Sequence, residues 1–248
     1  MSASGLRLLA LYPDQMNIYA DRGNIIFLQR RCEWRGIDFS YAAVGPGEGF
    51  DPAEHDLIYI GGGQDRDQVL VAEDMLRTKR DAIASAADDG AVLLAVCGGY
   101  QLLGHRYQLG DRSITGLGIA DLETVRDPGP RLIGNVSIEV DLGQGPRVLA
   151  GFENHGGRTH LGPQAEPLGR VLHGHGNNGR DGHEGVKRAN MIGTYLHGPL
   201  LPKNAWLADR LIALAIGRRT GSEPELDPLD DELEASAHAT ALRAAERS

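Results

Sequence analysis

Cys97 stands where a buried strand would turn directly into a helix. The six residues before it, 91–96, are all small or aliphatic, and the residues after it, GGYQLL, are typical of a tight turn that opens a helix. Unpaired N–H groups and the positive dipole end of a helix favour the reactive thiolate of a cysteine at such a turn. The pattern therefore indicates a cysteine nucleophile. A cysteine that only fills the core is the alternative that this local pattern leaves open.

A histidine and a glycine triplet follow two other apolar runs that predict strands. His197 comes after residues 191–196, and Gly61-Gly62-Gly63 comes after residues 57–60. Ligands of open parallel sheets bind beyond the carboxyl ends of the strands, so we expect both features beside Cys97. His197 suits the base partner of a thiol, and N–H groups of the triplet could hold an oxyanion. A bare tight turn is the alternative for the glycines.

The elements that must position these residues follow a βαβ rhythm. Strands are expected at residues 6–12, 37–44, 57–60 and 91–96, with helices after residue 24 and after residue 65 that end at Gly36 and Gly90. Short alternating runs over residues 107–152 predict antiparallel or peripheral strands. A closing helix is expected over 203–216, ended by Gly217. This order predicts an α/β fold with a mainly parallel central sheet.

Composition excludes several classes of protein. The 248 residues carry a net charge of −9 without a basic stripe, which argues against a nucleic-acid ligand. No apolar run is long enough for a membrane span or a signal peptide, so we expect a cytoplasmic protein. Cys32 and Cys97 lie far apart without metal-ligand spacing, which indicates reduced thiols, and Cys32 lies on the apolar face of a helix.

Two segments are expected to lie outside the catalytic machinery. Residues 218–248 are acidic, and we expect them to extend a single domain of residues 1–217 as an appendage or partner-binding segment, with a helix over 229–243. A glycine-rich tract contains His173, His175 and His183. It has no helical histidine pair and no cysteine, so we expect a mobile loop beside the active face and no metal site.

Several separated motifs resemble the class I glutamine amidotransferases of the cobyric acid synthase-like branch. They are CGGYQLLG at 97–104, TYLHGPLLPKN at 194–204, YIGGGQD at 59–65, ADRGN at 20–24 and FENHGGRT at 152–159. Within that branch they are most similar to the glutaminase subunits of lipid II isoglutaminyl synthases, whose partner is the Mur-ligase-like subunit MurT. The resemblance covers residues 5–217 and implies a flavodoxin-like three-layer fold.

The resemblance also implies roles for individual residues. Cys97 corresponds to the nucleophile and His197 to the histidine of the catalytic pair. Arg131 falls where the family has an arginine that contacts the glutamine substrate; from sequence alone it would be a surface residue, but a guanidinium matches an α-carboxylate in bidentate fashion. We expect Gly98 and either Gly62 or Gly63 to donate the N–H groups that hold the oxyanion.

The implied reaction is hydrolysis of L-glutamine to glutamate and ammonia. The MurT-like subunit would use the ammonia, with ATP and Mg²⁺, to amidate D-glutamate of membrane-anchored lipid II to D-isoglutamine. No cofactor is expected in this chain, and no membrane insertion. Two alternatives stay open: a subunit that amidates another carboxylate, such as a corrinoid, and a non-catalytic binding protein on the same scaffold.

Two positions depart from the wider family pattern. Ala95 replaces a glycine two residues before the cysteine, a small change. Pro199 replaces the glutamate that most class I members carry two residues after the histidine, an absence shared by the cobyric acid synthase-like branch. His197 therefore has no nearby carboxylate in the sequence to orient it. Asp21 or Glu153 could supply one within the chain, or the partner could supply one in trans.

Overall fold

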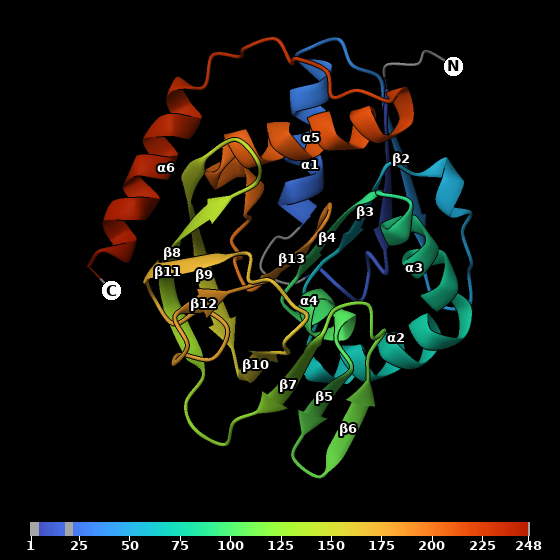
Figure 1. The fold of residues 1–248 in the computed structure, drawn as a ribbon, viewed down its shortest axis with the longest axis vertical. Helices are drawn as coiled ribbons and strands as arrows, with labels where there is room; N and C mark the ends of the chain where they lie inside the picture. The colour runs from blue at the N-terminus through green and yellow to red at the C-terminus, as the bar shows by residue number, and fades with distance from the viewer. Residues whose placement is uncertain (1–4, 18–21, 248) are drawn as a thin grey trace.

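A six-stranded sheet forms the centre of the computed structural model, which describes residues 5–17 and 22–247 (Figure 1). Its strand order is β13-β14-β4-β3-β1-β2. The parallel strands are β1 (Leu6–Leu11), β2 (Phe39–Val44), β3 (Leu57–Ile60), β4 (Val92–Val96) and β14 (Met191–Thr194), and β13 (Val186–Arg188) is an antiparallel edge. This confirms the predicted α/β fold with a mainly parallel sheet.

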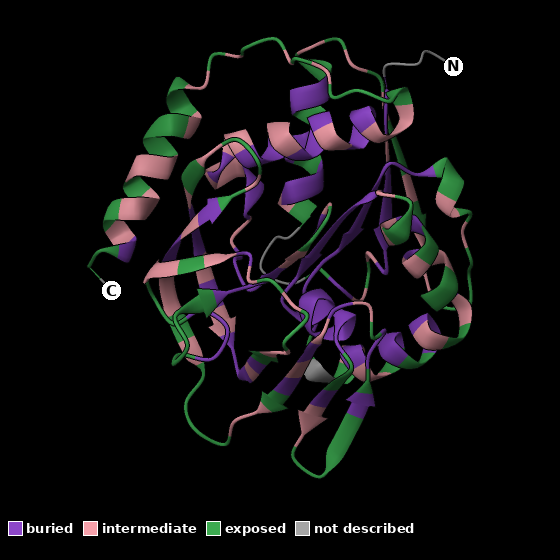
Figure 2. Cartoon of the chain, in the orientation of Figure 1, coloured by how far each residue is buried: buried purple, intermediate pink, exposed green. Residues whose placement is uncertain are grey.

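Helices cover both faces of this sheet, which gives three layers (Figure 1). Helices α1 (Arg22–Glu33) and α5 (Ala205–Thr220) pack against each other on one face, and α2 (Asp65–Thr78), α3 (Arg80–Asp88) and α4 (Gly98–Leu103) lie on the other. Every residue of β3 and β4 is buried, as Figure 2 shows for the middle of the sheet. Strands covered on both faces must be apolar throughout, which explains the unbroken runs LIYI and VLLAV.

Two smaller sheets lie beside the central one and confirm the predicted peripheral strands. The first contains β5 (Arg106–Leu109), β6 (Arg112–Thr115), β7 (Leu122–Arg126) and β10 (Gly157–Leu161). The second contains β8 (Leu132–Asp141), β9 (Pro146–His155), β11 (Gly169–His173) and β12 (His183–Glu184). All their pairings are antiparallel except that of β5 with β7. Short 3-10 helices occur at Pro52–Glu54 and Leu201–Lys203.

The single helix expected after residue 65 is broken at Lys79, where φ is −131°. The buried Lys79 ammonium pairs with Asp74 at 2.7 Å, and the Tyr12 hydroxyl donates to the same carboxylate oxygen at 2.8 Å. A buried ammonium is stable only when it is paired and hydrogen-bonded. The chain therefore turns inward at Lys79, and α3 starts in a new direction.

The closing helix does not end at Gly217, as the sequence predicted. It continues to Thr220 and ends at Gly221, whose φ of 82° lies in the left-handed region that favours glycine. Gly217 serves a different purpose: a Cβ there would lie only 2.9 Å from the Glu223 Cα. The glycine lets the following segment pass close to the helix.

The C-terminal extension packs along the second small sheet (Figure 1). Its helix, α6 (Glu232–Ala245), corresponds to the one expected over 229–243. Asp231 pairs at 2.6 Å with the guanidinium of Arg31, a fully buried residue of α1 that also pairs with Asp209 at 2.5 Å. The ion pair with the buried Arg31 therefore anchors the extension to the body of the protein.

The histidine-rich tract is tied into the interior, unlike the mobile loop that the sequence predicted. Asn177 is fully buried; its side-chain oxygen accepts from the Tyr100 hydroxyl at 2.9 Å, and its amide donates to the Gly185 carbonyl at 3.1 Å. The high glycine content reflects backbone turns rather than mobility, since Gly174, Gly176, Gly179, Gly182 and Gly185 all have positive φ. Within residues 5–17 and 22–247, no group of three His, Cys, Asp or Glu side chains is placed to hold a metal ion.

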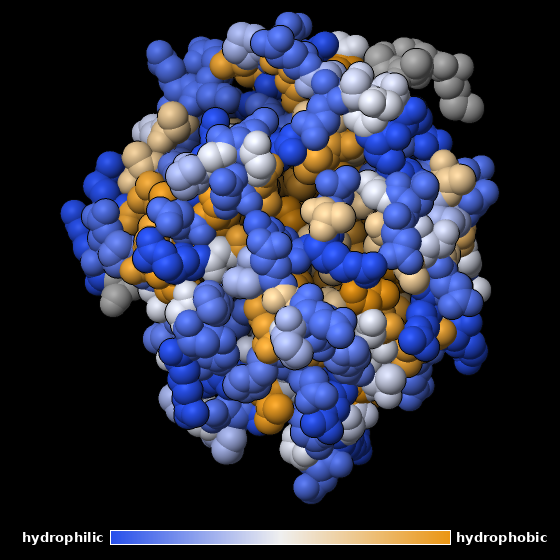
Figure 3. All heavy atoms as spheres, in the orientation of Figure 1, coloured by the Kyte–Doolittle hydropathy of each residue, from blue (hydrophilic) through white to orange (hydrophobic). Residues whose placement is uncertain are grey.

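The face in Figure 3 is mostly hydrophilic, and the apolar residues visible on it gather mainly where the surface is hollowed. None of the helices in the described part of the chain combines the length and the apolar character needed to cross a membrane.

Candidate active site

Cys97 forms a strained elbow between β4 and α4. Its φ of 50° lies in the left-handed region, which residues other than glycine rarely adopt. Such a conformation costs about 1–3 kcal/mol and persists only when the surroundings enforce it. Here the Cys97 N–H donates to the Thr194 carbonyl at 2.8 Å, which holds the elbow against the end of β14. The strand–turn–helix geometry predicted for this cysteine is present.

The two glycines after Cys97 allow α4 to approach the end of β3. A Cβ on Gly99 would lie 2.7 Å from the Ile60 carbonyl oxygen, and a Cβ on Gly98 would lie 2.7 Å from the Gln68 Nε2. The Gly99 N–H donates to the Gly61 carbonyl at 3.1 Å. Any side chain at positions 98 or 99 would push the helix away from this loop.

The glycine triplet lies beside the cysteine because β3 and β4 are adjacent and parallel. Ile60 pairs in register with Ala95, so the triplet begins level with the end of β4. The Gly63 nitrogen lies 3.0 Å from the position that a Cβ on Gly98 would occupy. Two backbone segments with few side chains therefore meet next to the sulfur, as the sequence predicted.

A cleft of about 390 Å³ contains Cys97 and brings several polar groups to it. It is lined by Gly63, Gln64, Arg66, Gln68, Cys97, Gln101, Tyr107, Arg131, His155 and Gly156. Although it borders the cleft, Cys97 is only 6% exposed. The exposed side chain of Arg131 donates from Nε to the Asn154 side-chain oxygen at 2.7 Å and from Nη2 to the Asn154 carbonyl at 2.6 Å. The structure thus places Cys97, Gly63 and Arg131 in one cleft.

His197 is positioned differently from the expectation of a strand end. Strand β14 stops at Thr194, and the chain then crosses to β9, where the His197 N–H and carbonyl both pair with Phe152, at 2.8 and 3.2 Å. The residue is fully buried and is not among those that line the cleft. Thr194, three residues earlier in the chain, accepts the Cys97 N–H with its carbonyl.

The buried carboxyl group of Glu184 fixes the turn that leads to His197. Glu184 accepts the Tyr195 N–H at 2.6 Å and the Thr194 hydroxyl at 3.0 Å, and that hydroxyl in turn accepts the Leu196 N–H at 3.0 Å. Burial is the main cause that raises the pKa of Glu184, to about 8; the hydrogen bonds from Tyr195 and Thr194 and the charge of His197 lower it, and the charge of Glu153 raises it. Sequence reasoning missed Glu184, because nothing in a glycine-rich tract marks one acid as buried.

The sequence suggested two acids, Glu153 and Asp21, that could orient His197, and the structure describes the first of them. Glu153 is fully buried, but its carboxylate accepts the backbone N–H groups of His175 and Gly176, at 2.6 and 2.9 Å, and lies 3.7 Å from the His155 Nε2. It therefore holds the histidine-rich tract in place. Asp21 lies outside the described residues.

His155, within the motif FENHGGRT, is a cleft residue to which the sequence assigned no role. Its Nδ1 contacts the Gly157 carbonyl at 2.8 Å, and its ring stacks on Tyr195 with centroids 3.6 Å apart. Burial lowers the pKa of His155, which favours the neutral ring. The Tyr195 hydroxyl accepts from the Gln101 amide at 3.1 Å, so this stack links β9 and α4 behind the cleft.

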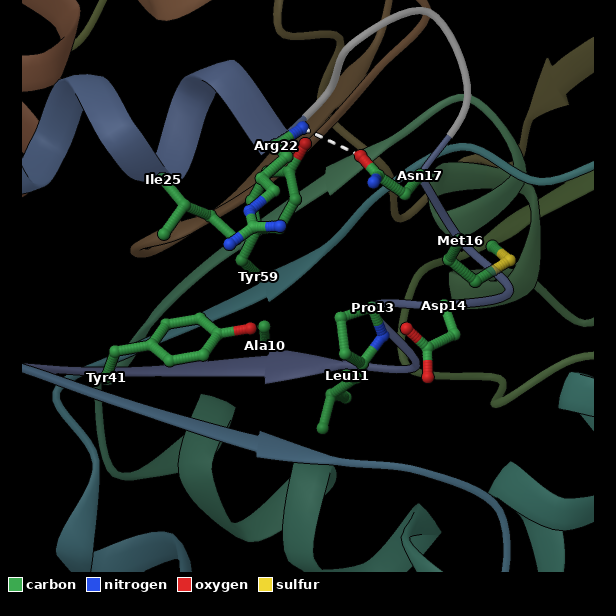
Figure 4. Close-up of a pocket in the computed structure, with 10 residues that line it drawn as sticks. All are labelled: Ala10, Leu11, Pro13, Asp14, Met16, Asn17, Arg22, Ile25, Tyr41 and Tyr59. Carbon is green, nitrogen blue, oxygen red and sulfur yellow. Dashed lines mark hydrogen bonds between the residues drawn. The ribbon is translucent and has the colours of Figure 1, made fainter.

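A second cavity of about 170 Å³ lies at the carboxyl end of β1 (Figure 4). Tyr41 and Tyr59 point into it, and the Arg22 N–H donates to the Asn17 side chain at 2.9 Å. Neither Cys97 nor Arg131 is among its lining residues. This cavity is therefore separate from the cysteine cleft.

The features of this site can be compared with those of known protein families. Residues 7–205 match the CobB/CobQ-like glutamine amidotransferase domain family, and the chain belongs to it. A structure of PurLQS from Thermotoga maritima shares the fold, with a TM-score of 0.57 at 17% identity, covering 96% of this chain and 99% of that one.

Two relatives cover nearly the whole chain. The chain is 40% identical over 235 residues to the GatD subunit of a glutamine-hydrolysing lipid II isoglutaminyl synthase from Staphylococcus aureus, covering 94% of this chain and 93% of the relative. It is 38% identical over 227 residues to the GatD subunit from Streptococcus pneumoniae, covering 91% and 86%. The similarity therefore extends well beyond the motifs around the cysteine.

The raised pKa of Glu184 predicts a pH dependence of stability. The folded chain keeps the Glu184 proton up to about pH 8, whereas the unfolded chain loses it near the ordinary value of 4.5. Between these values unfolding releases a proton, so this contribution to the free energy of unfolding is lost as the pH rises. Glu184→Gln has no such proton, and its urea-unfolding free energy should fall less than that of the wild type between about pH 5 and about pH 8.5, by a few kcal/mol.

Glu139→Gln is the matched control, because Glu139 is partly exposed and pairs with Arg170 at 3.1 Å on the second small sheet. Its pH profile of stability should follow the wild type. Parallel profiles for Glu184→Gln and the wild type would contradict a raised pKa at Glu184.

Proposed function

We propose that this chain is the glutaminase subunit of a lipid II isoglutaminyl synthase, which hydrolyses L-glutamine and passes ammonia to a Mur-ligase-like partner. The observation that carries the proposal is the Cys97 elbow, which opens into the same cleft as Arg131. The extent of the similarity to the two GatD subunits supports this assignment over other amidotransferases.

In the proposed reaction, His197 accepts the Cys97 proton and the thiolate attacks the side-chain amide carbon of glutamine. The carbonyl electrons move to oxygen, and the N–H groups of Gly63 and Gly98 stabilise the resulting charge. The His197 imidazolium protonates the departing nitrogen as the C–N bond breaks, which releases ammonia and leaves a γ-glutamyl thioester. Water, deprotonated by His197, then attacks the thioester, and glutamate leaves with regeneration of the thiol.

Gly63 is a better candidate than Gly62 for the first donor, because its nitrogen is the one that lies against Gly98. Removal of one such donor typically costs about 2.7–4 kcal/mol of transition-state stabilisation. ATP and Mg²⁺ belong to the partner in this proposal, as does the lipid-linked substrate.

Replacement of Cys97 tests the chemistry directly. Cys97→Ala should lower the glutaminase rate by at least about 10³-fold, since no nucleophile remains, and should abolish covalent labelling by an electrophilic glutamine analogue. The control is Cys32→Ala: Cys32 is fully buried, and burial raises its pKa to about 12, so labelling and activity should persist. Glutamine hydrolysis by Cys97→Ala would end the proposal, and a wild-type chain that is never labelled would favour a binding protein.

Arg131 is proposed to bind the α-carboxylate of glutamine, for which its exposed guanidinium at the cleft is suited. Arg131→Gln keeps a polar side chain but removes the charge. It should raise KM for glutamine about 10–100-fold, as expected for loss of a charged hydrogen bond, with a smaller change in kcat. A KM equal to that of the wild type would assign the carboxylate to another residue.

The partner can be tested by reconstitution. We expect a co-expressed MurT-like ligase to co-purify with this chain, and the complex to convert lipid II to its D-isoglutamine form with glutamine and ATP. If the partner also supplies the carboxylate that orients His197, glutaminase activity should rise when the complex forms; equal activity of the isolated chain would refute that role. A complex that amidates a corrinoid but not lipid II would favour the alternative substrate.

A further inference from the structure

The side chain of Gln68 lies against the glycine loop that follows β3. Gln68 belongs to the first turn of α2, is 2% exposed, and also lines the cleft that contains Cys97. Its Nε2 donates a hydrogen bond of 3.1 Å to the Gly63 carbonyl. The same Nε2 would lie 2.7 Å from a Cβ on Gly98. The Gln68 amide is therefore packed between the two segments to which the mechanism assigns the oxyanion donors.

The hydrogen bond from Gln68 restrains Gly63, whose N–H must be oriented toward the oxyanion. The loop of three glycines has no side chains of its own, and glycine has the widest choice of backbone conformations. An oxyanion hole is effective only when its donors are oriented before the charge develops. Resting on the proposed function, we propose that Gln68 is a positioning residue that holds the Gly63 N–H in the orientation needed to stabilise the oxyanion.

Met16 also contacts the glycine loop, through packing. The Met16 sulfur lies against the position of a Cβ on Gly63, and the Met16 carbonyl lies against that of Gly61. These contacts exclude side chains from the loop. Gln68 adds a directional contact from the first turn of α2, in which its N–H donates to the carbonyl of the N-cap residue Gln64 at 2.9 Å.

Gln68 also carries an energetic cost that a purely structural residue would avoid. Its Oε1 is buried and has no hydrogen-bond donor among the described residues. An unsatisfied buried acceptor destabilises a fold, and a methionine of similar length could fill the same space without that cost. The hydrogen bond from Nε2 to the Gly63 carbonyl explains why an amide occupies this position.

The test is Gln68→Met, which keeps the length of the side chain and removes the donor. We expect kcat for glutamine to fall about 10–100-fold, a part of the loss seen when an oxyanion donor is removed entirely, with KM within about threefold of the wild type. The melting temperature should change little, because loss of the unsatisfied Gln68 Oε1 offsets loss of the donor to the buried Gly63 carbonyl. Alkylation of Cys97 by iodoacetamide should stay within about twofold, because that displacement forms no oxyanion.

Gln29→Met is the matched control, since Gln29 is an exposed residue of α1 whose amide donates to Glu33 at 2.7 Å; it should have the kinetics of the wild type. A wild-type kcat for Gln68→Met would overturn the inference. So would a fall of melting temperature and alkylation rate together with kcat, which would indicate a structural role. A wild-type chain without glutaminase activity, alone or with its partner, would instead refute the proposed function.

Discussion

The hydrogen bond from the Cys97 N–H to the Thr194 carbonyl couples the cysteine elbow to the strand that precedes His197. It holds a cysteine in a backbone conformation that would otherwise relax, and it does so from the strand that leads to His197. Glu184 fixes the turn that follows that strand through its hydrogen bonds with Thr194 and Tyr195. The relative placement of two residues a hundred positions apart thus depends on a few buried polar contacts at the end of β14.

Those contacts belong to a group of polar side chains that lie deep in the interior. Glu153, Glu184, Asn177 and His155 all lie at or below 1% exposure. Glu153 accepts two backbone N–H groups and the carboxyl group of Glu184 accepts one, which offsets part of their desolvation. The network fixes the orientation of its side chains and lowers the stability of the fold. Such a cost is expected where a fold must hold a site in one geometry.

The sequence was informative where local patterns are strong. Apolar runs such as residues 57–60 and the Cys97-Gly98-Gly99 elbow have signatures that depend on neighbouring residues alone, and both predictions agree with the structure. The break at Lys79 was missed because it depends on Asp74 and on Tyr12, which is distant in sequence and follows β1. Glu184 and Gln68 were missed for the same reason: burial and contact partners set their importance, and neither is visible in a local pattern. The histidine-rich tract misled because glycine suits tight packing and mobile loops equally well.

Arg31 connects parts of the chain that lie 200 residues apart in sequence. Its guanidinium is wholly enclosed and cannot shed its charge, so it needs counter-charges that solvent does not supply. One comes from α5 and the other from the acidic extension. Removal of residues 218–248 would take away Asp231, one of the two counter-charges, and leave the buried Arg31 charge only partly compensated, so a shortened chain would not be a neutral substitute for the whole.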